Sequence, residues 1–366
     1  MPAAPAAKIA PISPHNPLGT DGFEFVEFTA PTAEGLEQLR GLFTAMGFSE
    51  TARHRSKDVW LFQQGDINFV LNGNPQGAVQ DFGREHGPSA CAMAFRVQNA
   101  QQAAAYVQAQ GATLEGSHAN FGELNIPCVH GIGGSLLYLV DRHGEQSIYD
   151  VDFVPLPGAD KNARSVGLKS IDHLTHNVRR GQMDVWADFY ARIAGFREIR
   201  YFDIEGKLTG LVSRAMTAPC GKIRIPINES RDEQSQIEEF IRDYHGEGIQ
   251  HIALSTEDIY ATVEALRANG VQFMSTPDTY YEKVDSRIPG HGEPLARLHD
   301  LSILIDGAPQ DDGILLQIFT QTVIGPIFFE IIQRKGNQGF GEGNFQALFE
   351  SIEEDQLRRG VIKGAD

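Results

Sequence analysis

The 366-residue sequence lacks several features that mark whole classes of protein. No run approaches the ~20 consecutive apolar residues of a membrane-spanning helix, which argues against an integral membrane protein. Basic residues are scarce, because 31 Lys and Arg stand against 48 Asp and Glu, for a net charge of -17. Nucleic acids and anionic membranes are bound through basic surfaces, so we expect neither as a partner.

Cysteine is also scarce, with only Cys91, Cys128 and Cys220, widely spaced and without a CxxC pair. Such scattered thiols argue against a disulfide framework and suit a reducing compartment, so we expect free thiols and a cytoplasmic protein. Residues 1–20 are rich in Ala and Pro but lack the apolar core of a signal peptide, and we expect a disordered arm. No Gly-rich phosphate loop follows the first strand of either half, which argues against dinucleotide binding.

What the sequence does contain is one order of elements, strand–helix–strands, repeated four times. The amino half has expected strands at 23–28 (half-buried by its alternation), 59–62, 67–71, 91–97 and 135–140, and helices at 36–46 and 100–110. The carboxyl half has strands at 170–178, 198–202, 210–213, 222–227, 248–254, 301–306, 314–320 and 327–333, and helices at 183–193 and 257–268, the latter with a capping-box-like start at Ser255.

The connection between Pro155 and Arg164 is the best domain boundary in the sequence, because it is rich in turn-forming residues. We therefore expect an N-terminal domain at 21–155 and a C-terminal domain at 165–366, each built from paired modules of the α+β class.

Three residues of the carboxyl half stand out, each inside a strand-like run. Glu330 interrupts an apolar, β-prone segment, where a carboxylate is costly to bury unless a cation meets it. His173 and His251 lie in similar runs on two other strands. Two histidines and one carboxylate on separate strands match the facial ligand set of non-heme Fe(II) oxygenases. Zinc on the same residues would favour four-coordinate hydrolysis instead.

The repeat supplies an internal control for these ligands. Aligning the two halves places Phe25 opposite His173, Ala92 opposite His251 and Tyr138 opposite Glu330. A lone histidine in a strand is more often a hydrogen-bonded core residue than a ligand, but here all three candidates replace apolar or aromatic residues at matching positions. His176 lies three residues after His173 and is expected to face the opposite side of its strand.

The expected surroundings of the site are aromatic and polar. Such a box, with amide and hydroxyl groups for orientation, suits a flat phenolic ligand. Its members are Phe319, Phe328, Phe340, Phe345, Gln236, Gln250, Gln317, Asn228 and Ser213.

A glycine-rich link at 336–343 leads into a last helix, expected at 343–359, with Phe345, Leu348, Phe349, Ile352 and Leu357 on one face. Either a mobile lid or a terminal helix docked on the sheet explains this pattern.

The chain resembles the 4-hydroxyphenylpyruvate dioxygenases over nearly all of its expected ordered length. The motifs that carry the resemblance are 172–178 (DHLTHNV), 226–229 (PINE), 248–254 (GIQHIAL), 315–320 (LLQIFT), 329–334 (FEIIQR) and 339–345 (GFGEGNF). The last two are highly specific as a pair.

The resemblance implies a vicinal-oxygen-chelate fold: two barrel-like domains of paired βαβββ modules, the carboxyl one catalytic, with a closing helix. It implies one Fe(II) held by His173, His251 and Glu330. It also implies that 4-hydroxyphenylpyruvate and dioxygen are converted to homogentisate and carbon dioxide in tyrosine breakdown, by decarboxylation, ring hydroxylation and side-chain migration. We further expect a homo-oligomer, a dimer or a tetramer.

By motif, the resemblance also assigns roles in the substrate pocket. Gln317 and Gln250 would line it, and Ser213, Asn228 and Gln236 would be polar partners of the substrate. Phe319, Phe328, Phe340 and Phe345 would wall the ring, although plain core packing explains these phenylalanines as well, and Asn344 would sit on the closing helix.

Three alternatives stay open at this point. A 4-hydroxymandelate synthase shares substrate, metal and fold, but hydroxylates the benzylic carbon. A non-catalytic small-molecule-binding protein of the same fold would resemble the amino half. An extradiol ring-cleaving dioxygenase would use the same ligands on a catechol, but its acid–base residues are not evident in this sequence.

Overall fold

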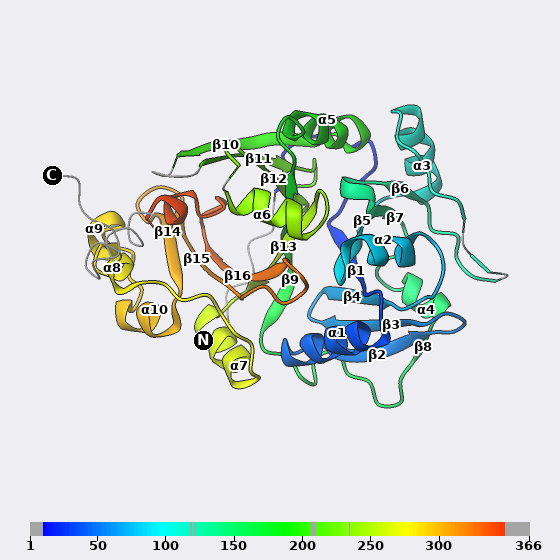
Figure 1. The fold of residues 1–366 in the computed structure, drawn as a ribbon, viewed down its shortest axis with the longest axis horizontal. Helices are drawn as coiled ribbons and strands as arrows, with labels where there is room; N and C mark the ends of the chain where they lie inside the picture. The colour runs from blue at the N-terminus through cyan, green and yellow to red at the C-terminus, as the bar shows by residue number, and fades with distance from the viewer. Residues whose placement is uncertain (1–9, 118, 121, 206–209, 234, 348–366) are drawn as a thin grey trace.

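The structure is a computed structural model that describes residues 10–347 except 118, 121, 206–209 and 234. It contains two eight-stranded mixed sheets, one from each half of the chain, which lie side by side in Figure 1. The strand order is β6-β7-β5-β1-β4-β3-β2-β8 in the amino half and β10-β11-β12-β9-β13-β16-β15-β14 in the carboxyl half. The expected α+β class is confirmed.

The amino half contains strands β1 to β8 and helices α1 to α4. Their bounds are β1 Phe23–Thr29, α1 Ala33–Ala45, β2 Ser49–His54, β3 Val59–Gln64, β4 Ile67–Asn72, α2 Ala78–His86, β5 Ser89–Arg96, α3 Ala100–Ala109, β6 Cys128–His130, β7 Leu136–Val140, α4 Ile148–Asp152 and β8 Phe153–Pro155.

The carboxyl half contains strands β9 to β16 and helices α5 to α10. Their bounds are β9 Leu168–Val178, α5 Met183–Ala194, β10 Arg197–Glu205, β11 Gly210–Thr217, β12 Arg224–Ser230, α6 Gln236–Asp243, β13 Gly248–Thr256, α7 Ile259–Ala268, α8 Asp278–Tyr281, α9 Val284–Arg287, α10 Leu295–Leu301, β14 Leu304–Ala308, β15 Gly313–Phe319 and β16 Phe328–Lys335.

The cross-strand register confirms the alignment of the two halves. In the amino half Phe25 pairs with Ala94, and Ala94 pairs with Tyr138. In the carboxyl half His173 pairs with Ala253, and Ala253 pairs with Glu330. An irregularity also recurs at the same place, between Glu27 and Phe28 against β5 and between Ile249 and His251 against β9.

Several expectations about single elements are wrong. Strand β1 is buried along its whole length rather than on one face. Its Val26 and Phe28 lie in the main core with Phe43 of α1, and its Phe25 packs in a second cluster with residues of β3, β4, β5 and α4. Its buried Glu24 accepts hydrogen bonds from Arg96 Nε at 2.6 Å and from Asn68 Nδ2 at 3.3 Å. Helix α7 is capped by Asp258, which accepts from the Ala261 amide, and not by Ser255, whose hydroxyl contacts that of Ser170. Residue Leu301 ends helix α10 instead of starting a strand.

Residues 10–20 do not form the expected disordered arm. The amide of Ile12 donates to the Pro219 carbonyl at 2.9 Å, and the side chains of Leu18 and Thr20 are buried. This segment therefore fastens the start of the chain to the carboxyl half, while residues 1–9 of the expected arm lie outside the described residues.

The two halves share one continuous core, to which both sheets contribute. The rings of Phe69 on β4 and Phe329 on β16 stack with their centroids 5.9 Å apart. Gln64 Oε1 accepts a hydrogen bond from the Val166 amide at 2.8 Å, which ties the connection to strand β3. All three cysteines are free thiols, and the structure buries each of them. Among the described residues, the structure contains no helix that is both long and apolar enough to span a membrane.

Candidate active site

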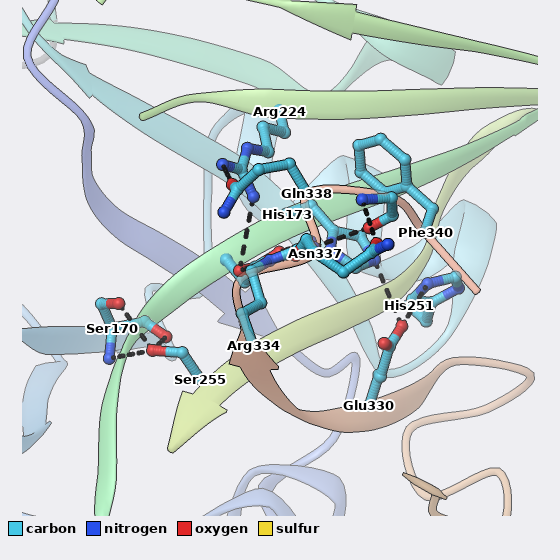
Figure 2. A network of polar contacts seen from close by, with 12 residues as sticks. Ser170, His173, Arg224, His251, Ser255, Glu330, Arg334, Asn337, Gln338 and Phe340 are labelled. Atoms are coloured by element: carbon cyan, nitrogen blue, oxygen red, sulfur yellow. Dashed lines mark hydrogen bonds and ion pairs between the residues drawn. The ribbon is translucent and has the colours of Figure 1, made fainter. Parts of the chain in front are cut away.

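The side chains of His173, His251 and Glu330 meet inside the carboxyl sheet, where β9, β13 and β16 run side by side (Figure 2). One Glu330 oxygen, Oε2, lies 3.2 Å from His173 Nε2 and 3.3 Å from His251 Nε2. One potential ligand atom from each residue falls within 4.8 Å of the others, and all three residues are buried.

The strand register explains why these side chains converge. Ala253 on the central strand is flanked by His173 on one side and Glu330 on the other, and its small side chain leaves room between them. His176 lies on the other face, as expected, where its Nε2 contacts the Tyr190 hydroxyl at 2.8 Å. Burial lowers the pKa of His176 to about 3, so this histidine is a neutral core residue.

Both histidines are held from behind by hydrogen bonds at Nδ1. His173 Nδ1 donates to Asp172 Oδ1 at 2.8 Å, and His251 Nδ1 donates to Gln250 Oε1 at 2.7 Å. These contacts direct both Nε2 atoms at Glu330, the orientation in which a metal-binding histidine offers Nε2 as its ligand atom. The sequence placed Gln250 in the pocket lining, whereas the structure places its amide oxygen behind a candidate ligand.

The charge state of the group suits a divalent cation. Burial alone would raise the pKa of Glu330, but the facing imidazoles of His173 and His251 overcome this effect and lower it to about 2. The other carboxylate oxygen, Oε1, is buried and has no hydrogen-bond partner among the described residues. A buried ionised carboxylate with an orphaned oxygen, beside two imidazole nitrogens, is the donor set that Fe(II) accepts in facial three-ligand sites.

A network that the sequence did not reveal supports His173. Asp172 is bound by Arg334 through two parallel hydrogen bonds, Nε to Oδ2 at 2.8 Å and Nη2 to Oδ1 at 2.7 Å. Arg224 approaches the same carboxylate at 3.7 Å. Burial alone would raise the pKa of Asp172, but these guanidinium groups hold it well below its usual range. The sequence contained a signal for this network, since Asp172 adjoins His173 and Arg334 follows Glu330 by four residues on one strand, an even spacing that places both side chains on the same face.

The same arginine reaches the glycine-rich loop. Arg334 Nη1 donates to the Asn337 carbonyl at 3.1 Å and to the Gly339 carbonyl at 2.6 Å, and its guanidinium lies over the Phe340 ring (Figure 2). The Phe340 ring in turn meets the His173 ring edge-on at 5.3 Å. One side chain therefore connects the support of a candidate ligand to the loop that covers the site.

The cavity beside the three residues measures only about 40 Å³. Five residues expected in the pocket line it: Ser213, Asn228, Phe319, Phe340 and Phe345. Phe328 lies behind His251, with the two rings stacked at 4.9 Å. The cavity is also lined by residues that were not expected as pocket residues: Thr175, Phe202, Leu211, Pro226 and Glu342.

The remaining expected residues lie further back. Gln317 is buried, and its Oε1 accepts from Asn344 Nδ2 at 3.3 Å, while Asn344 Oδ1 accepts from the Tyr280 hydroxyl at 2.6 Å. Gly341 has a φ of +79°, and a Cβ there would lie 1.8 Å from Gln317 Oε1, so only glycine allows this loop to approach so closely. Gln236 begins α6 and is not among the described residues that line the cavity.

The expected closing helix is described only at its start. Residues 342–347 are helical, one residue earlier than expected, and Phe345 covers the cavity from this segment. Residues 348–359, with Leu348, Phe349, Ile352 and Leu357, lie outside the described part of the chain.

Comparison with known proteins relates both halves to one superfamily. Residues 15–154 match the family model described as "Hydroxyphenylpyruvate dioxygenase, HPPD, N-terminal". Residues 170–284 match the model of the "Glyoxalase/Bleomycin resistance protein/Dioxygenase superfamily". The chain is 78% identical over 330 residues to a protein of Pseudomonas aeruginosa named 4-hydroxyphenylpyruvate dioxygenase, covering 90% of this chain and 92% of that one. The chain belongs to the 4-hydroxyphenylpyruvate dioxygenase family.

Other relatives carry different names or further domains. The chain is 68% identical over 333 residues to "Hemolysin VllY" of Vibrio vulnificus, covering 90% of this chain and 93% of that one. A solved structure titled "xylose isomerase-like TIM barrel/4-hydroxyphenylpyruvate dioxygenase fusion protein" is similar with a TM-score of 0.77 and 32% identity. The match covers 96% of this chain but 55% of that fusion protein. The two-domain fold expected from the resemblance is therefore confirmed, and the two-histidine, one-glutamate set is consistent with Fe(II) in a 4-hydroxyphenylpyruvate dioxygenase.

Proposed function

We propose that this protein is an Fe(II)-dependent dioxygenase that converts 4-hydroxyphenylpyruvate and dioxygen to homogentisate and carbon dioxide. One observation carries the proposal: a buried His173, His251 and Glu330 group, with an orphaned carboxylate oxygen, in a chain 78% identical to a protein named for this activity. In this proposal the three residues are the metal ligands, and the metal is one Fe(II) per chain.

When bound, Fe(II) supplies open coordination positions for a chelating 2-oxo acid and for dioxygen, and the redox chemistry between them. The protein orients the ligand side chains and excludes water from the site. Asp172 and Gln250 accept from Nδ1 of the two imidazoles and so keep Nε2 of each ring toward Glu330, and a metal that replaces the Nε2 protons meets rings that are already oriented. Glu330 stays ionised at neutral pH and keeps its charge for the metal.

The aromatic side chains of the cavity are suited to enclose the substrate ring and exclude water. Phe319 comes from β15, whereas Phe340 and Phe345 come from the glycine-rich loop and the start of the last helix, so rings from different segments converge. Ser213 and Asn228, a cross-strand pair on β11 and β12, present polar groups to the same cavity. We assign them as hydrogen-bond partners of the phenol. Gln317 acts from behind the cavity: it accepts a hydrogen bond from Asn344 and lies against Gly341, and so holds the covering loop.

The size of the cavity implies movement of the covering segment. About 40 Å³ holds only a few water molecules and no aromatic acid. In our proposal residues 340–347 swing outward to admit the substrate and close over it afterwards, as active-site lids do. The glycines at 339, 341 and 343 supply the hinge.

A 4-hydroxymandelate synthase would use the same ligands, and the product distinguishes the two activities. Purified protein with Fe(II), 4-hydroxyphenylpyruvate and dioxygen is expected to yield homogentisate and carbon dioxide in equal amounts. Formation of hydroxymandelate, or no consumption of the substrate by iron-loaded protein, would overturn the proposal.

We also propose the domain division at 21–155 and 165–366, a cytoplasmic location and a homo-oligomer, a dimer or a tetramer. Two separate sheets joined near residues 156–167 support the division, and three free buried thiols are compatible with the location. The mass of the protein in solution tests the oligomeric state.

A further inference from the structure

A second cavity, away from the metal ligands, is much larger than the one beside them. It measures about 760 Å³ and lies in the amino half, lined partly by Phe25, Asn72 and Tyr138. By register, these positions correspond to His173, Asn228 and Glu330 of the carboxyl half. Pockets for small molecules measure ~300–1,000 Å³, so the amino half has a pocket of ligand size at the place where the other half has its metal site.

Glu27 is the unusual residue of this cavity. It lies on β1, two residues after Phe25, and only 4% of it is exposed. Asn72 Nδ2 donates to its Oε1 at 2.6 Å, and the Tyr138 hydroxyl also faces the carboxylate and partly offsets the rise that burial causes in its pKa. The Oε2 atom of Glu27 nevertheless has no partner within hydrogen-bond geometry among the described residues. A buried carboxylate oxygen without a donor is costly, and the carboxyl half has Thr175 at the same register position. The fold therefore does not require a glutamate here.

The other carboxylates of the cavity wall already have cationic or imidazole partners. Glu115 contacts His130 at 2.7 Å, Glu123 contacts Lys57 at 2.7 Å, and Asp152 contacts Arg55 at 3.4 Å. No ion pair of Glu27 is found among the described residues. Four carboxylates and one lysine make the wall acidic, which disfavours an anionic ligand and favours a cation.

The remaining wall is apolar and aromatic. Its main members are Phe25, Val59, Val70, Tyr138, Tyr149 and Phe153. Such a wall accommodates a hydrophobic body, and aromatic faces attract ammonium groups.

We propose that this cavity is a second small-molecule site, which takes an organic amine with an apolar body and binds its ammonium group at Glu27 Oε2. The site is separate from the iron ligands and does not depend on the proposed reaction. An ammonium group donates a hydrogen bond to the unpartnered Oε2 and gives Glu27 a positive partner of the kind that Glu123 and Asp152 of the wall already have.

Three probes with the same apolar body test the proposal: phenethylamine, phenethyl alcohol and phenylpropionate, which are cationic, neutral and anionic. Binding to the iron-loaded full chain is measured by calorimetry at pH 8. Burial raises the pKa of Glu27 to about 7, so the carboxylate is ionised at that pH. Tyr138, Cys91 and Cys128 face it and stay protonated, because burial raises their pKa values. We expect phenethylamine to bind about tenfold more tightly than the alcohol, and the acid most weakly at this site.

Two variants assign the binding to this cavity. Glu27→Gln keeps the shape and the Asn72 contact, and is expected to remove the tenfold preference for the amine. Val79→Trp, which places a large ring in the cavity from α2, is expected to remove binding of amine and alcohol alike. Glu34→Gln, an equal loss of charge on the exposed face of α1, should leave the affinity unchanged.

Equal affinity of wild type, Glu27→Gln and Val79→Trp for phenethylamine would overturn the proposal, as would a preference for phenylpropionate that Val79→Trp removes. Any binding at the iron site is common to all these proteins and cancels in the comparison.

Discussion

The two halves of the chain arrange the same order of strands around two very different interiors. At matching positions the carboxyl half has His173 and Glu330, where the amino half has Phe25 and Tyr138. The cavity beside the first pair is about 40 Å³, whereas the cavity beside the second is about 760 Å³. The repeated fold thus supplies a pocket twice, and the side chains on its strands decide what each pocket can bind.

The difference also shows how a carboxylate is buried in each half. Glu330 faces two imidazoles, which lower its pKa to about 2 and keep it charged. Glu27 has an amide donor, and burial raises its pKa to about 7. On similar strands, one glutamate is therefore ionised at neutral pH and can bind a metal, whereas the other is about half protonated near pH 7.

Removing the charge of Glu330 should break the comparison most completely. Glu330→Gln keeps the shape but loses the anionic ligand, so we expect loss of bound iron and of turnover to background. Metal analysis and a homogentisate assay check both effects, with Glu34→Gln as the control for one lost charge. A variant that keeps its iron and full activity would remove Glu330 from the site.

Deleting the chain after Gly339 removes Phe340 and Phe345 from the cavity and makes the carboxyl half as open as the amino half. We expect turnover to fall by at least about 100-fold while iron binding changes little, because a closing lid shields the reaction from water and completes the site. Parallel measurement of iron content and turnover separates the two roles. Normal turnover after the deletion would show that this segment is only packing.

Asp172 tests whether the support behind His173 matters. Asp172→Asn keeps the shape of the side chain but loses the charge that binds Arg334 and His173. We expect the affinity for iron to fall by roughly 10–100-fold, as is typical when the hydrogen-bond partner behind a metal ligand is changed. Titration of the apoprotein with Fe(II) measures it. Asp278→Asn, an exposed carboxylate that contacts His299, is a matched control. An equal loss in the two variants would contradict a specific role.

Glu27 should affect stability with a defined pH dependence. Its pKa is about 7 in the folded protein and 4.5 when unfolded, so the folded state binds the extra proton between these values, and stability falls as pH rises from 4.5 to 7. The shift corresponds to at most about 3 kcal/mol. Glu27→Gln is therefore expected to be more stable than wild type at pH 8, and equally stable near pH 4.5. Denaturant unfolding at both pH values measures this, and equal stability at pH 8 would contradict it.

Much of the site was predictable because successive side chains of a strand alternate between the two faces of the sheet. A histidine or glutamate in an apolar strand, checked against its counterpart in the repeat, identified His173, His251 and Glu330 as one group. The same logic separated His176, which indeed packs against Tyr190. The signals that failed were local ones. Ser255 resembles a helix cap but contacts Ser170, and the helices α8, α9 and α10, of four to seven residues, are too short to show a clear period.

The sequence by itself determined the order of the modules, the family and the three candidate ligands, since these depend on residue type and on spacing along a strand. Only the tertiary structure decided which groups stand behind the ligands, because Asp172, Arg334 and the Gly339 carbonyl meet through sheet curvature and a loop path that no periodicity encodes. It also decided the size of each pocket, which depends on the volume left between side chains from distant segments. The sequence showed Glu27 only as a polar residue of an alternating strand, whereas the structure places it in a buried position on the wall of a cavity.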